Sequence, residues 1–176
     1  VNQENAKLQT VLAKQLALAE AAKPAGDTII MPSRGTATAT FQAHTTGNYQ
    51  VIVTAGAQQA GDEVARLELA VDNKPVGVLE IPASHRKMEK YMVEVMVTKG
   101  VHQVSATFIN DFYNPDDPDP ANRDRNMFLR SLECRGPTMV DKSDLPESHR
   151  RLIIAYPDDK QNVLQAGSHV LAPLMR

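Results

Sequence analysis

The sequence has no tryptophan, only one cysteine, and an aromatic content of 5% across 176 residues. A lone cysteine, Cys134, excludes an internal disulfide and a zinc site with four cysteine ligands. A Cys-x-x-Cys-His sequence is absent, so haem is not attached covalently within this chain. With so few aromatic side chains, a flat surface of rings for stacking a ligand is hard to build.

An excess of basic charge and a long apolar run are missing as well. The chain carries 19 Lys plus Arg against 21 Asp plus Glu, a net charge of -2, which gives no broad basic field for binding nucleic acid. No apolar run approaches the roughly 20 residues that a membrane-spanning helix needs, so we expect no membrane insertion. The first residues lack a basic-then-apolar signal pattern, and we expect any targeting segment to lie outside this sequence.

Hydrophobic residues make up 42% of the chain and charged residues 23%, which is typical of a globular domain with one main core. Residues 1–23 are rich in Ala, Leu, Gln, Lys and Glu, and their apolar side chains recur at spacings of three and four. This spacing predicts a helix, which Pro24 and Gly26 end because proline removes a backbone donor and glycine adopts the conformation that closes helices. We therefore predict an N-terminal helical segment over residues 1–26.

Residues 27–136 change to a period of two, the spacing at which one face of a β-strand is buried. Turn residues such as Gly47, Asn73 and Gly100 separate the alternating runs. The pattern predicts seven strands, at 36–41, 49–55, 64–71, 76–81, 91–97, 101–109 and 126–134. Because no helical segment intervenes, we predict an all-β fold, an antiparallel jelly-roll-like β-sandwich.

Residues 137–176 change character again. A polar linker is followed by a helix-like stretch that begins at Asp158, where Gln161 completes a weak capping box. We predict a linker and a short helical tail, the start of a following domain. Its apolar residues are expected to dock on the sandwich or on a neighbouring domain of the same polypeptide.

Chemically informative residues are concentrated in segment 110–126, between the last two predicted strands. This segment holds five of the 12 aspartates of the chain, Asp111, Asp116, Asp117, Asp119 and Asp124. Carboxylates within about 5 Å repel one another by roughly 1 kcal/mol per pair even in water, so a compact loop of this kind favours a bound cation. Ca2+ is the best match, because it takes oxygen ligands and the loop offers carboxylates, amides and backbone carbonyls but no His or Cys.

Three prolines, Pro115, Pro118 and Pro120, stiffen the same loop and reduce the entropy that is lost when a ligand binds. The loop is not an EF-hand, because counting from Asp117 puts Phe128 where the bidentate glutamate would stand. A solvated loop that binds nothing is the alternative, since Asp, Asn and Pro populate turns for backbone reasons alone. Composition leaves both interpretations open.

Several segments carry a resemblance to a known family. Gly100–Val104, Phe108–Asp111 and Asp124–Met127 are similar to the calcium-dependent, xylan-binding type of carbohydrate-binding module, as are the earlier segments 49–51 and 67–73. The resemblance covers roughly residues 28–136. It implies a non-catalytic, extracytoplasmic module in which Ca2+, held by loop carboxylates and backbone oxygens, accepts two neighbouring sugar hydroxyls as ligands.

The resemblance also implies roles for single residues. The expected metal ligands are Asp111 and Asp124, which lie in the matching segments, and the further candidates are Asp116, Asp117 and Asp119. The expected carbohydrate contacts are Asn110, Tyr113 and Asn126. Alternatives remain open for these three, since the amides also suit strand-end caps and the tyrosine an ordinary surface turn. The expected partner is a polysaccharide or oligosaccharide.

The missing tryptophan bears on this expectation in two ways. It supports recognition through metal and hydrogen bonds, and it is also compatible with a module that has lost sugar binding. The flanks, Gly136-Pro137 and Leu145–Arg151, resemble the junction in large planctomycete proteins that carry cytochrome c domains around such a sandwich. This implies a middle piece of a larger protein.

Three further hypotheses concern other functions. In the first, the sandwich is a structural or interaction module in which Ca2+ only ties a loop. In the second, Asp111 and Asp124 form a glycosidase pair, which requires carboxyl groups about 5 to 9 Å apart; nothing indicates a deep cleft, so we predict no enzyme. In the third, Cys134 acts as a nucleophile, but a buried structural thiol at a strand end is the expected role.

Overall fold

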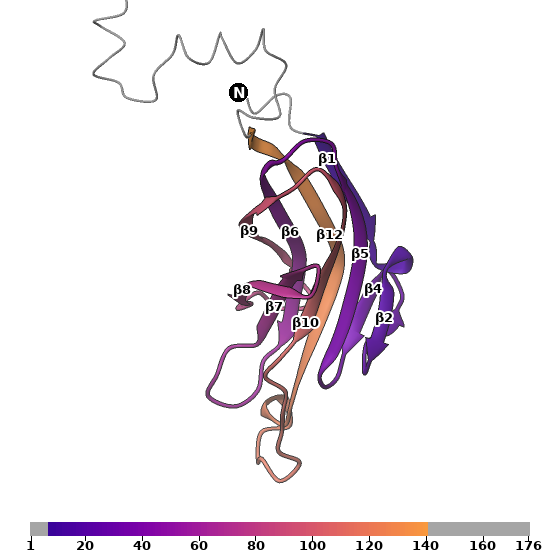
Figure 1. The fold of residues 1–176 in the computed structure, drawn as a ribbon. Helices are drawn as coiled ribbons and strands as arrows, with labels where there is room; N and C mark the ends of the chain where they lie inside the picture. The colour runs from indigo at the N-terminus through magenta and orange to yellow at the C-terminus, as the bar shows by residue number, and fades with distance from the viewer. Residues whose placement is uncertain (1–6, 141–176) are drawn as a thin grey trace, which may run out of the picture. The chain divides into compact units, whose positions relative to one another are not determined.

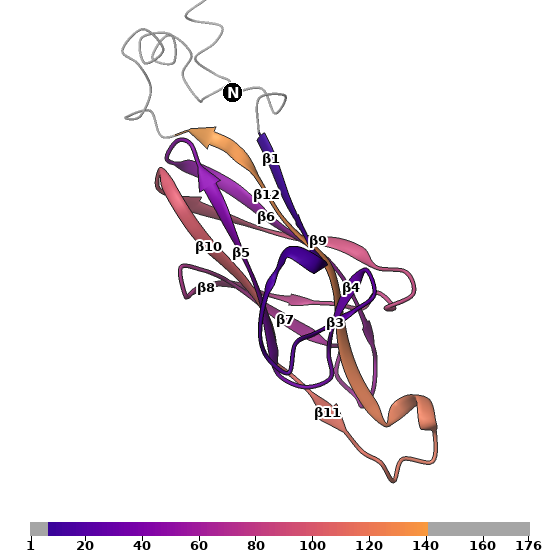
Figure 2. The ribbon, with the colours of Figure 1, turned by 90° about the vertical axis from the view of Figure 1, so that its right-hand side faces the viewer.

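The computed structural model describes residues 7–140, with side-chain environments up to residue 138, and these residues form a sandwich of two antiparallel sheets (Figures 1 and 2). One sheet has the strand order β3-β4-β12-β6-β9, and β1 and β11 also pair with β12. Its strands are β1 (Lys7–Leu12), β3 (Lys23–Ala25), β4 (Thr28–Met31), β6 (Gly47–Gln58), β9 (Glu89–Val97), β11 (Phe112–Tyr113) and β12 (Asp124–Val140).

The second sheet has the order β2-β5-β10-β7-β8. Its strands are β2 (Ala17–Glu20), β5 (Gly35–Ala43), β7 (Arg66–Val71), β8 (Lys74–Glu80) and β10 (Gly100–Phe108). Two single-turn 3-10 helices complete the described part, η2 (Ala13–Gln15) and η3 (Pro120–Asn122). None of the helices among residues 7–140 is long and apolar enough to cross a membrane.

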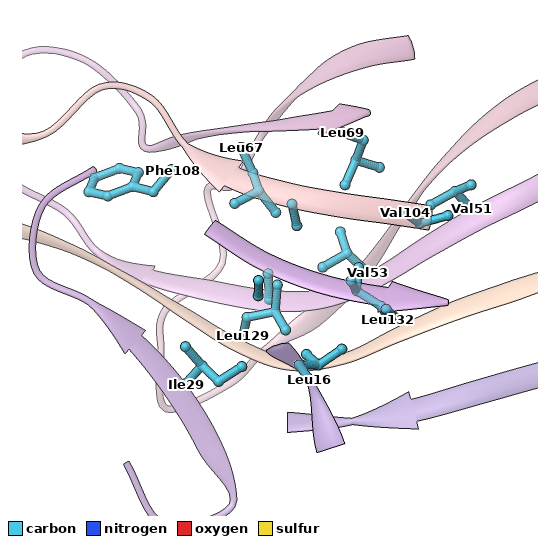
Figure 3. Close-up of a cluster of buried hydrophobic side chains, with 14 of the residues drawn as sticks. Leu16, Ile29, Val51, Val53, Leu67, Leu69, Val104, Phe108, Leu129 and Leu132 are labelled. Atoms are coloured by element: carbon cyan, nitrogen blue, oxygen red, sulfur yellow. The ribbon is translucent and has the colours of Figure 1, made fainter. Parts of the chain in front are cut away.

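The core lies between the sheets and is built by the alternation that the sequence contains. All seven predicted strands are confirmed, as β5, β6, β7, β8, β9, β10 and β12. On β6, for example, Tyr49, Val51, Val53 and Ala55 are buried on one face, while Gln50 and Thr54 on the other face are only half-buried. Figure 3 shows these two valines packed among Leu67, Leu69 and Val104 from the opposite sheet. Because each of the seven predicted strands places one apolar face in this layer, the all-β sandwich prediction is confirmed.

Strand β12 crosses the core along most of its length. Leu129 and Leu132 are both fully buried although they lie three residues apart, so the strand shifts its alternation between them. Cys134 continues the buried row, and its thiol is free. Burial raises the pKa of the Cys134 thiol to about 11, which makes it a poor nucleophile. The expected structural thiol is confirmed.

The prediction of an N-terminal helix is wrong for the described residues 7–26. This segment forms β1, η2, β2 and β3, and β1 pairs with β12 from Lys7 opposite Gly136 to Leu12 opposite Ser131. The turn of η2 buries Ala13 and Leu16, three residues apart, in the core (Figure 3 labels Leu16). The helical spacing was therefore produced by one short turn placed between two alternating strands. The predicted helical tail lies outside the described residues.

A hydrogen-bonded ion pair, His102 with Asp72, lies at the end of the sandwich where β10 begins. The His102 imidazole contacts the Asp72 carboxylate through Nδ1 at 2.7 Å and the Thr98 carbonyl through Nε2 at 2.7 Å. Asp72 also accepts from the backbone N–H of Gln103 at 2.9 Å. Since both ring nitrogens face acceptors, the doubly protonated imidazolium satisfies both contacts and the neutral ring satisfies only one.

We expect this pair to make stability depend on pH. Partial burial of the ring opposes its charge, but the hydrogen bonds to Asp72 and Thr98 outweigh it and raise the pKa of His102 above 6.5. The bond from His102, and then the one from Gln103, lower the pKa of Asp72 below 3.8. The stabilisation is complete between pH 3.8 and 6.5, and it is lost as pH rises through the folded-state pKa of His102 or falls through that of Asp72.

The measurement is the free energy of unfolding against pH for the wild type and for His102→Gln. Glutamine keeps a donor toward Asp72 without a titrating charge. The difference between the two proteins is expected to be largest on the acid side of neutrality and to shrink at alkaline pH. A difference that stays constant across this range would show that the imidazolium contributes nothing.

Candidate functional site

The acidic segment lies at the opposite end of the sandwich, where β10 finishes. It projects beyond the sheets as a hairpin-like loop before the chain returns along β12 (Figures 1 and 2). At its base, β11 pairs with the start of β12, with Phe112 opposite Arg125 and Tyr113 opposite Asp124. Arg125 therefore lies at the base of the loop, where it is buried, while Tyr113 keeps 68% of its surface exposed.

Hydrogen bonds within the loop fix the shape of its tip. The Asp117 carboxylate accepts from the backbone N–H of Asp119 and from the Asn122 amide, each at 2.9 Å. The Asp119 carboxylate caps η3 by accepting from the N–H of Ala121 at 2.9 Å. These are the local turn bonds that Asp favours, so two of the predicted metal ligands have a backbone role. Each carboxylate has further lone pairs, and the bonds do not saturate them.

A second loop, between β6 and β7, lies against the acidic one. The N–H of Gly61 donates to the Asn122 Oδ1 at 2.7 Å, and the ring of Phe112 covers the same glycine. A Cβ at position 61 would lie 2.9 Å from a ring carbon of Phe112, and the backbone there has a φ of +68°. Glycine is required at this contact for both reasons. We call the two segments together, residues 58–66 and 110–126, the two-loop end.

Arg125 joins the two loops from below. It keeps only 2% of its surface exposed, and its guanidinium donates to the backbone carbonyls of Asn110 (2.7 Å), Glu63 (2.7 Å) and Ala60. The charge also lies 5.5 Å from the ring centre of Phe112, within the range of a cation–π contact. Desolvation lowers the pKa of Arg125, although the nearby carboxylates of Glu63 and Asp111 oppose this. The arginine therefore fixes the spacing of both loops.

The two asparagines of the predicted site bond to protein atoms. The Asn110 Oδ1 accepts from the N–H of Arg66 at 2.6 Å, and its amide donates to the Val64 carbonyl at 2.9 Å. Asn126, with 6% of its surface exposed, donates to Asp124 at 2.9 Å and to Gln58 at 3.3 Å. In these positions both amides join the ends of neighbouring strands across the two-loop end.

The electrostatics of the two-loop end favour a cation. It carries seven carboxylates (Asp62, Glu63 and the five loop aspartates) and three arginines, so its net charge is 3 minus 7, or -4. Two of the arginines, Arg123 and Arg125, donate to backbone carbonyls, and Arg123 Nε reaches the Asp117 carbonyl at 2.7 Å. Guanidiniums bound in this way offset only part of the negative charge.

The two-loop end offers the kinds of oxygen ligand that Ca2+ takes. Carboxylate, amide and backbone oxygens are all present and His and Cys are absent, which suits a hard cation. However, no three His, Cys, Asp or Glu side chains in the described part of the chain lie together as a metal-binding group. The Asn126 amide links the Asp124 carboxylate to Gln58 Oε1 by donating to both. The residues fit calcium by ligand type, and the carboxylates do not converge.

Sequence reasoning found the acidic loop but missed its partner loop. Of residues 58–66, residues 58–63 lie between the predicted strands 49–55 and 64–71, and their only local signal is a Gly61-Asp62-Glu63 turn. The contacts of residues 58–66 with Asn110 and Arg125 span 44 to 65 residues along the chain. Periodicity in the sequence indicates local secondary structure and does not predict contacts between residues so far apart in the chain.

Comparison with known proteins gives one family and one fold. Residues 50–147, more than half of the chain, match the family model CBM60, described as a Ca-dependent, xylan-binding carbohydrate-binding module. The comparison with curated proteins gave no match. Similar solved structures include the CBM36-1 domain of a multidomain xylanase from the hindgut metagenome of Trinervitermes trinervoides, with 12% identity and a TM-score of 0.56 over 76% of this chain and 100% of that one.

Two further structures share the fold. The native structure of a family 35 carbohydrate-binding module from Clostridium thermocellum has 11% identity and a TM-score of 0.52, covering 73% of this chain and 97% of that one. The Podospora anserina GH26-CBM35 β-(1,4)-mannanase has 9% identity and a TM-score of 0.53, covering 84% of this chain and 34% of that one. At these identities the likeness establishes the sandwich architecture alone.

Proposed function

Since this chain belongs to the CBM60 family of Ca-dependent, xylan-binding carbohydrate-binding modules, we propose that its two-loop end binds xylan-like polysaccharide with the help of Ca2+. The module is non-catalytic, and in this proposal it tethers a larger extracytoplasmic protein to its substrate. The observation that carries the proposal is the position of the acidic loop. Within the sequence matched by the family model, five aspartates stand on one projecting loop at one end of the sandwich.

Asp111 and Asp124 are the proposed first ligands of the ion. Both lie at the base of the loop, where pairing of β11 with β12 holds the backbone. The further proposed ligands are Asp116, Asp117 and Asp119. A bound Ca2+ offers coordination positions to hydroxyl oxygens, which is the chemistry that neighbouring sugar hydroxyls supply. The acidic side chains supply the negative charge that attracts the ion, and the hydrogen bonds of Arg125 hold the two loops together.

The proposed carbohydrate contacts are Asn110, Tyr113 and Asn126. Tyr113 is the one large aromatic side chain among the exposed hydrophobic residues of the described part. A single ring gives little stacking area, so hydrogen bonds and metal contacts carry the recognition. Sites that stay open to water compete with solvent for every hydroxyl, and we therefore expect modest affinity.

A structural module is the second candidate function, and one observation favours it. Asp117 and Asp119 already accept backbone hydrogen bonds inside their own loop. In this alternative Ca2+ only stabilises the loop, and the module positions neighbouring domains. The planctomycete, cytochrome c-bearing setting belongs to the proposal only through the resemblance of the flanking residues, most of which lie outside the described part.

Calorimetric titration with xylo-oligosaccharides tests the proposed function. Binding heats are expected in calcium and are expected to vanish after chelation and return when calcium is restored. Equal heats in both conditions would contradict calcium-mediated binding. No heat in either condition, together with a lower melting temperature after chelation, would favour the structural module.

A further inference from the structure

Strand β9 leaves one of its edges open. It ends the first sheet, and among residues 7–140 its only strand partner is β6, to which it pairs without a break from Gly47 opposite Val97 to Ala55 opposite Glu89. The nine residues of β9 include no proline and no glycine. An open edge presents a row of unpaired N–H and C=O groups, which is a template for another strand.

The other terminal strands are protected in ways that β9 is not. Strand β8 contains Pro75, and its pairing with β7 shifts register between Leu69 and Ala70. Strand β3 contains Pro24 and has three residues, and β2 has four residues. Prolines, irregular pairing and short length are the devices by which proteins block edge-to-edge association. Among residues 7–140, β1 also pairs with one strand, β12, and lacks proline, but it has six residues. With nine residues, β9 is the longest of these edge strands, and it has neither proline nor a register shift.

The outward-facing side chains of β9 are unusual for a solvated edge. Met92 and Met96 each keep 58% of their surface exposed. They alternate with two charges of opposite sign: Lys90, whose side chain is 61% exposed while it pairs with Glu133 at 2.9 Å, and Glu94, which accepts from Gln50 at 3.2 Å. The order Lys-x-Met-x-Glu places an apolar side chain midway between a cation and an anion.

We propose that two copies of this chain associate by antiparallel pairing of their β9 strands about a two-fold axis at Met92. In this register Met92 faces the partner's Met92, and Lys90 faces the partner's Glu94. The same opposite-charge pair recurs on the other side of the axis, so the edge is self-complementary. Directly opposed residues of antiparallel strands interact most strongly, and opposite charges there stabilise the pair.

The residues that pair in this association, 90–94 of β9, are separate from those of the two-loop end. The value of the association for a binding module is multivalency, because a dimer presents two binding ends and the second binding event becomes intramolecular. The pairing of edges itself requires neither calcium nor glycan. Its failure is therefore distinguishable from failure of the proposed function.

Sedimentation velocity over about a hundredfold range of concentration tests the dimer by mass action. The wild type is expected to shift from monomer to dimer, equally in calcium and in chelator.

Glu94→Lys places a second cation opposite the partner's Lys90 and is expected to weaken the dimer by about tenfold or more. The double variant Lys90→Glu with Glu94→Lys restores opposite charges and is expected to recover dimerisation. Glu68→Lys, on β7 of the other sheet, is the matched control and is expected to leave dimerisation unchanged.

A wild type that stays monomeric at every concentration would overturn the proposal, whatever the variants do. So would a dimer that Glu94→Lys leaves intact, or one that the double variant fails to restore while circular dichroism shows it to be folded. Dimerisation that needs calcium would also overturn it, since the contact would then lie at the two-loop end.

Discussion

Replacing Arg125 with methionine is expected to lower the free energy of unfolding by about 3 kcal/mol. Methionine keeps much of the length and apolar stem, but it leaves the carbonyls of Asn110, Ala60 and Glu63 without their donor. Buried acceptors that lose a charged donor retain their desolvation cost, which makes the loss larger than for an average hydrogen bond. Urea unfolding followed by circular dichroism measures the change.

Arg130→Met is the matched control, because it removes the same kind of side chain from the same strand. Arg130 keeps half of its side chain exposed, and its nearest anion, Asp27, lies 3.6 Å away. An exposed ion pair of this kind is worth about 0 to 1 kcal/mol. If the two variants destabilise the protein equally, the hydrogen bonds from Arg125 to the two loops do not stabilise the fold.

Removal of the Asp124 carboxylate is expected to have the second large effect. Asp124→Ala is expected to reduce calcium-dependent binding of xylo-oligosaccharide by at least about a hundredfold, which equals the loss of about 2.7 kcal/mol. Asp124 lies at the base of the acidic loop and its Oδ2 already accepts from Asn126, so it is held in place before any ligand arrives. Calorimetric titration in calcium gives the affinities.

Asp124→Asn separates charge from shape in the same assay. The asparagine keeps an oxygen that accepts from Asn126, but it removes the negative charge that a hard cation needs. We expect it to bind glycan as poorly as Asp124→Ala while it unfolds, in chelator, close to the wild type. Asp27→Ala removes an exposed aspartate elsewhere and is expected to bind like the wild type. Full binding by Asp124→Asn would show that the carboxylate is not a calcium ligand.

The sandwich was predictable because burial on one face of each strand imposes a period of two. This signal is strong wherever branched apolar residues alternate with polar ones, as in Tyr49, Val51 and Val53 of β6. It is weak in β1 and β2, which are short, exposed and rich in Ala, Leu and Lys, residues that favour helices. There the pairing of β1 with β12 overrode local propensity.

The acidic loop of the site was predictable from composition, but the second loop that packs against it was not. Five aspartates on one segment indicate a cation site without any structural information. The role of Arg125 as a link between loops depends on carbonyls that lie up to 65 residues away, and carbonyls carry no signature in a sequence. The partner loop was missed for the same reason.

A crystal structure of the protein grown with calcium and a xylo-oligosaccharide tests the central claim most directly. We expect a density peak inside the two-loop end with oxygen ligands at about 2.3 to 2.6 Å, including the Asp124 carboxylate and two sugar hydroxyls. An acidic loop that contacts only water under these conditions, or a sugar bound elsewhere on the sandwich, would contradict it.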